Sequence, residues 1–262
     1  TWFGTADGLI SYDGQFWTRW SIEENSPADN SINQLQYLSG ENALWIATDN
    51  GSSKAGLSEG FSIESSYTTD NSRIYDAMVY SVHANPDDIK IFGTAAGVSV
   101  FNNTMWSKIQ NLSVIDSINL ADNPVRSIGS TEDNTFIASD GKGIYLTSND
   151  VDGVSFVTSW VFPYNIPTSD NVKTAFVDSD GNQWYGTDAG AVFHAGLTAQ
   201  GSWSDPVTTS QGLPDNQVNS IIEDVYGNIW FGTENGLAVL KTDESMSVFS
   251  ESDGLINNQI TD

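Results

Sequence analysis

The sequence of 262 residues contains no cysteine, which excludes disulfides, thiolate metal sites and cysteine catalysis. Basic residues are also scarce, with 9 lysines and arginines against 34 acidic residues and a formal net charge of −25. Nucleic acids and anionic membranes are bound largely through Lys and Arg, so this balance argues against both as partners. No run of 18 apolar residues occurs, and the sequence therefore predicts no membrane-spanning helix.

The clearest pattern in the chain lies between Gln211 and Leu240. Within it, VNSIIED alternates apolar and polar residues, VYGN has the composition of a tight turn, and NIWFGT is rich in β-branched and aromatic residues. A third apolar segment, LAVL, follows a second turn. Gly227 and Gly236 stand where two-residue hairpins require a positive φ, which glycine adopts at little cost. The stretch predicts a meander of antiparallel strands.

The end of the second strand of this meander recurs as a three-residue tag: a bulky residue, a small residue, then Thr or Ser. The six copies are FGT at 3–5, IAT at 46–48, FGT at 92–94, IAS at 137–139, YGT at 185–187 and FGT at 231–233. They are 43, 46, 45, 48 and 46 residues apart, the length of one four-stranded propeller blade. We therefore predict an all-β, six-bladed propeller of four-stranded antiparallel blades, forming a single domain over residues 1–262.

The unit GLPDNQVNSIIEDVYGNIWFGTENGL closely resembles the two-component regulator propeller repeat. The resemblance covers nearly the whole chain and is strongest over 211–240 and 170–190 and weakest over 50–72. Proteins of this family include the periplasmic sensor parts of bacterial hybrid histidine kinases and some other secreted bacterial proteins. The resemblance implies a rigid periplasmic or extracellular propeller that senses or binds, commonly glycan breakdown products, rather than one that does chemistry.

The two chain ends are expected to share one blade. The C-terminal GLINNQITD matches GLPDNQVNS, which leads into a first strand, so we expect it to supply the strand that the N-terminal segment lacks. Ile260 would then precede Thr5 by only 7 residues, against 14 to 20 in the other blades. This shortage of residues indicates a lost hairpin or an excision from a longer array, and leaves a seventh blade open.

The tags place the remaining blades. In the second blade, the segment GSSKAGLSEG is expected to form a long loop. Their expected bounds are Ile32–Thr68, Ile74–Ile109, Val125–Trp160, Val172–Trp203 and Val218–Phe249. Three tryptophans beside the tags, Trp45, Trp184 and Trp230, are predicted to pack between blades. Aromatic residues on the outer strands are interpreted as packing residues too, with sugar stacking as the alternative; they are Trp17, Trp20, Trp106, Phe156, Trp160, Trp203 and Phe249.

Polar residues near the start of each first strand form the candidate ligand site, because these strand starts converge at one end of a propeller. Short polar side chains two positions before the first apolar residue hold turns, or alternatively present amides to a ligand. Nearby cations on so acidic a chain suit a carboxylated or sulphated ligand, although pairing with neighbouring acids is the alternative. The candidate residues are Arg73, Tyr75, Arg126, Lys173, Asn33, Asn123, Asn216, Asn219 and Asn258.

Catalytic chemistry finds little support in the sequence. The only histidines, His83 and His194, belong to different blades and are not expected to converge. DSDGN at 178–182 and EDVYGN at 223–228 resemble calcium loops, but lack the full ligand frame and are interpreted as turns. We expect no catalytic residue, cofactor or metal, and a module that binds a polar or acidic glycan or other small molecule beside other domains of a parent sensor. A channel-centred polysaccharide lyase or hydrolase and a structural interaction scaffold remain as alternatives.

Overall fold

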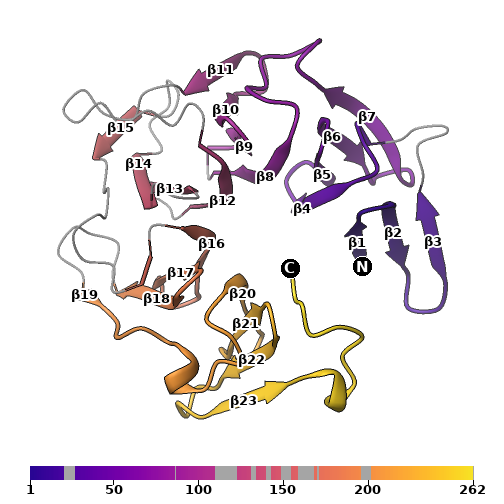
Figure 1. Ribbon diagram of the computed structural model, residues 1–262. Coiled ribbons are helices and arrows are strands. Elements are labelled where there is room, and N and C mark those ends of the chain that lie inside the picture. The colour runs from indigo at the N-terminus through magenta and orange to yellow at the C-terminus, as the bar shows by residue number, and fades with distance from the viewer. Residues whose placement is uncertain are drawn as a thin grey trace. The chain divides into compact units, whose positions relative to one another are not determined.

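The computed structural model describes residues 1–20, 27–85, 87–109, 123–130, 134–139, 143–148, 155–158, 168–169, 171–195 and 202–261. The chain divides into two compact units, one of residues 1–128 with 148–156, the other of residues 129–147 with 157–262. Almost every described element is a β-strand (Figure 1). The helical exceptions in the described ranges are two 3-10 turns, η1 (Thr209–Gln211) and η2 (Glu251–Asp253).

Six antiparallel sheets follow one another along the chain, each a meander in which every strand pairs with the next (Figure 1). The first unit holds β1 (Trp2–Thr5), β2 (Gly8–Tyr12) and β3 (Trp17–Trp20); β4 (Ile32–Leu38), β5 (Ala43–Thr48), β6 (Gly51–Gly56) and β7 (Ser62–Tyr67); and β8 (Val79–Ala84), β9 (Lys90–Thr94), β10 (Gly97–Phe101) and β11 (Trp106–Ile109). The second holds β16 (Val172–Val177), β17 (Gln183–Thr187), β18 (Gly190–Ala195) and β19 (Ser202–Trp203); and β20 (Val218–Glu223), β21 (Ile229–Thr233), β22 (Gly236–Leu240) and β23 (Met246–Phe249). Residues of both units form β12 (Val125–Ser130), β13 (Asn134–Ser139), β14 (Gly143–Ser148) and β15 (Ser155–Thr158).

The prediction of six four-stranded blades is wrong in one blade. Five sheets have four strands, but the first has three, in the order β1-β2-β3. Residues 254–261, expected to provide its fourth strand, form no strand. The physical reason lies in the shortage of residues already visible in the sequence, because too few remain after Ile260 to build a strand and its hairpin.

Two further expectations about strand positions are corrected. The segment beginning at Gly51, expected to be a long loop, is strand β6, and its small residues are mostly buried. The third blade starts at Val79 rather than at Ile74, because Val79 pairs with the tag residue Thr94. Ile74 is buried, at 1% exposure, but it packs in the core ahead of the strand.

The tag is explained by the turn that follows it. Its threonine hydroxyl donates to the carbonyl oxygen of the glycine three residues later, at 2.7 to 2.9 Å, in all five sheets whose tag ends in threonine. These glycines have φ between +114° and +137°, a region that other residues rarely adopt. The tag therefore marks the tight turn between the second and third strands of each blade.

The small middle residue of the tag makes room for the next blade. A Cβ added to Gly186 would lie 2.8 Å from Cγ1 of Val218, the first residue of β20. A Cβ added to Gly232 would lie 2.6 Å from Cγ2 of Ile260, whose backbone N–H donates to the carbonyl of Thr233 at 2.9 Å. Ile260 thus packs as the leading residue of a further first strand would.

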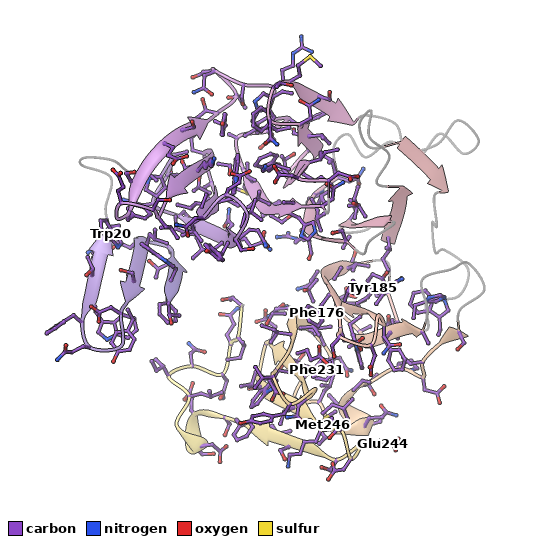
Figure 2. All side chains as sticks on the ribbon, turned by 180° about the vertical axis from the view of Figure 1, so that it is seen from behind. Trp20, Phe176, Tyr185, Phe231, Glu244 and Met246 are labelled. Carbon is purple, nitrogen blue, oxygen red and sulfur yellow. The ribbon has the colours of Figure 1, made fainter. Side chains whose placement is uncertain are left out.

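Aromatic side chains pack between neighbouring sheets, as predicted, at Trp45 and Trp184. Trp45 is 1% exposed and Trp184 is 4% exposed, whereas Trp230 is only partly buried. In the second unit, Trp184 packs against Phe231, with Met246 at the edge of the same cluster (Figure 2 labels the last two). Of the outer-strand aromatics, Trp160 lies outside the described residues.

Candidate ligand-binding site

The site is built on an irregularity shared by the first strands of four sheets. In each, the pairing register shifts directly after the leading apolar residue, which is the mark of a β-bulge. A bulge leaves one residue unpaired and redirects its side chain, and bulges are frequent next to functional sites. The four bulged residues are Asn33, Tyr80, Lys173 and Asn219.

In the first unit, Asn33 links its own sheet to the next. Its Nδ2 donates to Oδ1 of Asp49, the residue after the tag, and to the carbonyl oxygen of Val79, both at 2.9 Å. Arg126 lies one residue after the leading residue of β12, and its guanidinium stacks 4.6 Å from the centre of the Tyr80 ring. This group therefore contains a partly buried carboxylate and an exposed cation that stacks on an aromatic ring.

In the second unit, Asn219 repeats the geometry of Asn33. Its Nδ2 donates to Oε1 of Glu234, again the residue after a tag, at 3.0 Å, and to the carbonyl of Ile260 at 2.9 Å. Lys173 Nζ lies 3.5 Å from Oδ1 of Asn219, and Gln259 Nε2 donates to Oε2 of Glu234 at 2.9 Å. These contacts form one polar network, in which the carboxylate of Glu234 joins Asn219 to Gln259.

The acids of this second group are held in their charged form. The hydrogen bond from Asn219 lowers the pKa of Glu234, with further help from Gln217, Gln259 and the charge of Lys173. Burial acts to raise the pKa of Asp188, but hydrogen bonds from Ser169 and Asn171 and the charge of Lys173 outweigh it, so that pKa is lowered too. Lys173 is thus shared between two carboxylates.

The structure brings some of the predicted site residues together and separates others. Asn33 and Asn219 lie at bulges, Lys173 does so beside Asn219, and Arg126 occupies the matching position of β12. Arg73 and Tyr75 do not stand at the start of a first strand, because both precede Val79 and belong to the connection before β8, and their contact with a ligand stays a prediction. Tyr80 takes the register that the sequence had suggested for Tyr75.

The polar residues that precede the first strands are mostly used locally. Oδ1 of Asn216 accepts from the backbone N–H of Thr209, and Oδ1 of Asn258 accepts from that of Glu251, both at 2.8 Å. These bonds hold the two 3-10 turns, which supports the turn-holding interpretation over ligand contact. Asn123 lies at the approach to β12 and is partly buried.

Sequence reasoning missed the carboxylate that follows several tags. Asp49, Asp188 and Glu234 each stand directly after a tag threonine, and each accepts a side-chain amide hydrogen bond. The signal was present, because the position is acidic at 49, 140, 188 and 234. Position 140 lies outside the described residues.

Neither histidine is placed for catalysis. His194 is 3% exposed and packs edge-on against Trp203, with ring centres 4.9 Å apart. Burial lowers the pKa of His83 to about 4, so it is neutral at pH 7. Among the described residues, no three His, Cys, Asp or Glu side chains are arranged to hold a metal ion.

The calcium-like segments are turns, as predicted. Oδ1 of Asp178 accepts from the backbone N–H of Asn182, and its Oδ2 accepts from Nε1 of Trp184 at 2.8 Å. Asp224 makes the same bonds to Asn228 and Trp230, and these side-chain bonds lower its pKa to about 2. Both carboxylates therefore hold the hairpin turn and accept a hydrogen bond from the tryptophan that directly precedes the tag of the same sheet.

Residues 212–235 match the family model described as Two component regulator propeller. This unit is a two-component regulator propeller repeat. The regulator propeller repeat contains the bulged Asn219, the tag threonine and Glu234, so the hydrogen bond from Asn219 to Glu234 lies within the matched residues. A search of curated proteins finds no match to the chain.

Solved structures share the fold. The extracellular domain of a putative hybrid two component system from B. thetaiotaomicron matches with a TM-score of 0.74 and 18% identity, covering 99% of this chain and 35% of that one. Virginiamycin B lyase from Staphylococcus aureus matches with a TM-score of 0.66 and 13% identity, covering 95% and 80%. This chain thus spans about a third of that sensor structure, and the comparisons establish a β-propeller fold.

In the part of the chain that the structure describes, none of the helical segments has the length and hydrophobicity of a membrane-spanning helix.

Proposed function

We propose that this chain is the ligand-binding propeller of a bacterial sensor, located in the periplasm or outside the cell and joined to other domains of its parent protein. The regulator propeller repeat supports this proposal. So does the likeness to the extracellular domains of a putative hybrid two component system and of a putative one component system.

The ligand that fits best is a hydroxyl-rich oligosaccharide. Both N–H groups of Asn33 and of Asn219 are already donated, so what these groups offer a ligand is carboxylate acceptors, Asp49 and Glu234. Carboxylates accept hydrogen bonds and cannot donate them when ionised, which suits sugar hydroxyls. A uronic acid or sulphated sugar would meet like charge there, so the neutral glycan is favoured over the acidic one.

The observation that supports this proposal most directly is a hydrogen bond from the side-chain amide of a bulged Asn to a carboxylate, found once in each unit. We expect Arg126 to contribute in the first unit, because its exposed guanidinium is held over the ring of Tyr80.

Calorimetric titration with neutral and uronate-containing oligosaccharides tests the proposal. We expect a neutral glycan to bind and its affinity to fall roughly tenfold or more in Glu234→Ala, since one hydrogen bond to a charged group contributes about 1.5–3 kcal/mol. Asp243→Ala removes an acid that is exposed in the turn after β22 and whose recorded partner is the neighbouring Ser245, and it is the control. Unchanged binding in both Glu234→Ala and Arg126→Ala would refute the site, and turnover of any glycan would favour the lyase or hydrolase.

A further inference from the structure

The side chain of Lys90, the first residue of β9, has no exposed surface. Burial of a lysine is costly unless its ammonium group is paired and hydrogen-bonded. Nζ of Lys90 donates to Oε1 of Glu41, to Oδ1 of Asp88 at 2.7 Å and to the carbonyl oxygen of Asp88 at 3.1 Å. It also donates to Oδ1 of Asn103 at 2.8 Å. Oxygen atoms on several sides of one ammonium resemble the coordination of a cation more than a single ion pair.

Three turns of the first unit supply these oxygens. Glu41 lies between β4 and β5 of the second sheet, whereas Asp88 lies between β8 and β9 and Asn103 between β10 and β11 of the third sheet. All three turns are at the strand ends remote from the tags, so this group is separate from the bulged residues of the candidate site. We call Glu41, Asp88 and Asn103 the oxygen cage.

The two cage residues of the third sheet are held in place by more than their bonds to Lys90. Asp88 has a φ of +62° and Asn103 a φ of +67°, in the left-handed region that costs most residues free energy. Nδ2 of Asn103 donates to Oδ2 of Asp88 at 2.8 Å, while Oδ1 of the same amide accepts from Lys90. The oxygens are therefore positioned for a cation by the turns themselves.

Glu41 is shared between two ammonium groups. Its Oε1 accepts from Lys90, and its Oε2 lies 2.8 Å from Nζ of Lys54, which also pairs with Glu64 at 3.3 Å. Burial acts to raise the pKa of Glu41, but the hydrogen bonds and charges of the two lysines outweigh it, so that pKa is lowered. Glu41 is thus ionised, and Lys54 remains as its partner if Lys90 is shortened.

We propose that the oxygen cage is a binding site for one monovalent, ammonium-sized cation, and that the chain fills it with its own Lys90. The N–O distances of 2.7 to 3.1 Å exceed the 2.3–2.6 Å that calcium requires, which favours an ammonium group over a divalent metal. A cation attached to the chain is not captured from solution, so its binding costs less entropy. The second and third sheets are therefore joined without dependence on a free ion.

Chemical rescue of Lys90→Ala tests the proposal. The substitution removes a fragment with the size and charge of n-propylammonium and leaves Glu41 paired with Lys54. We expect the melting temperature to fall by roughly 10 °C, the scale set by loss of one partner of a buried ion pair in a chain of this length. n-Propylammonium chloride should restore at least half of this loss. Tetramethylammonium chloride, which has no N–H to donate, should restore none at the same ionic strength.

Two comparisons separate binding in the cage from a general effect of salt. Each variant is measured against the parent protein in the same salt, because screening of the net charge of −25 acts on both. Lys54→Ala is the matched control, since Lys54 pairs with the same carboxylate but its side chain is 25% exposed. We expect no recovery of Lys54→Ala by n-propylammonium. Equal recovery of the two variants, or a folded Lys90→Ala that does not recover, would overturn the proposal.

A second substitution tests the cage even where Lys90→Ala does not fold. Asn103→Gly removes an oxygen ligand but relieves the backbone, because glycine adopts a positive φ at little cost. Glu244 has a φ of +65° and is exposed in the turn between β22 and β23, so Glu244→Gly measures the backbone effect alone (Figure 2). We expect Asn103→Gly to lower the melting temperature by several degrees and Glu244→Gly to leave it unchanged or raise it. A melting temperature of Asn103→Gly at or above that of the parent would show that the cage does not need this oxygen, against the proposal.

Discussion

Removal of the Trp45 side chain tests the packing that holds neighbouring sheets together. Trp45 is 1% exposed, stacks on Tyr67 and meets Phe92 edge-on. Truncating a buried large aromatic residue costs about 3–5 kcal/mol, and two ring contacts place this position at the upper end of that range. We therefore expect Trp45→Ala to lower the free energy of unfolding by about 4–5 kcal/mol.

The same substitution at Trp230 is the matched control, because Trp230 holds the same place in the last sheet. It is partly buried and stacks on Phe249, so Trp230→Ala should cost about 2 kcal/mol, including its bond to Asp224. Urea unfolding followed by circular dichroism and by fluorescence measures both, since 9 tryptophans leave ample signal. An equal or larger loss at Trp230 would refute the argument from burial.

Two other predictions follow from the packing and from burial. Gly232→Ala should destabilise the protein by about 1–3 kcal/mol, because the new Cβ would clash with Oγ of Ser220 and with Ile260. Thermal unfolding of Gly232→Ala with and without Ile260→Ala should show partial rescue, since the Ser220 contact remains. Burial lowers the pKa of His83 from 6.5 to about 4 in the folded protein. Between these two values the unfolded chain binds a proton that the folded chain does not, so the free energy of unfolding should fall as the pH drops from 6.5 towards 4. His83→Gln should flatten that fall in urea titrations across this pH range, and an unchanged slope would contradict the assignment.

Much of the blade pattern could be predicted because its signals are local. The tag contains its own turn, in which a threonine hydroxyl closes on a glycine carbonyl three residues later. Its middle residue must be small, since the next sheet packs over it. Each requirement falls within a few consecutive residues, so six repeats were visible without knowledge of the rest of the chain.

The start of the third blade shows where local signals fail. Ile74 and Val79 are both apolar and both buried, at 1% and 0% exposure, so either could lead a strand. The choice is made by pairing with Thr94, which depends on the turn between β8 and β9 and not on the residues around Ile74. Because β8 begins at Val79, Tyr80 stands at the start of the first strand, in the position that the sequence had suggested for Tyr75.

The chemistry of the site could be predicted only in part, for a similar reason. Counting cations near the strand starts favoured an acidic ligand, but a count does not show which groups already have partners. Lys173 lies between the charges of Asp188 and Glu234, and Arg126 stacks on Tyr80. The bulges bring such partners together across neighbouring sheets from positions 46 residues apart in sequence.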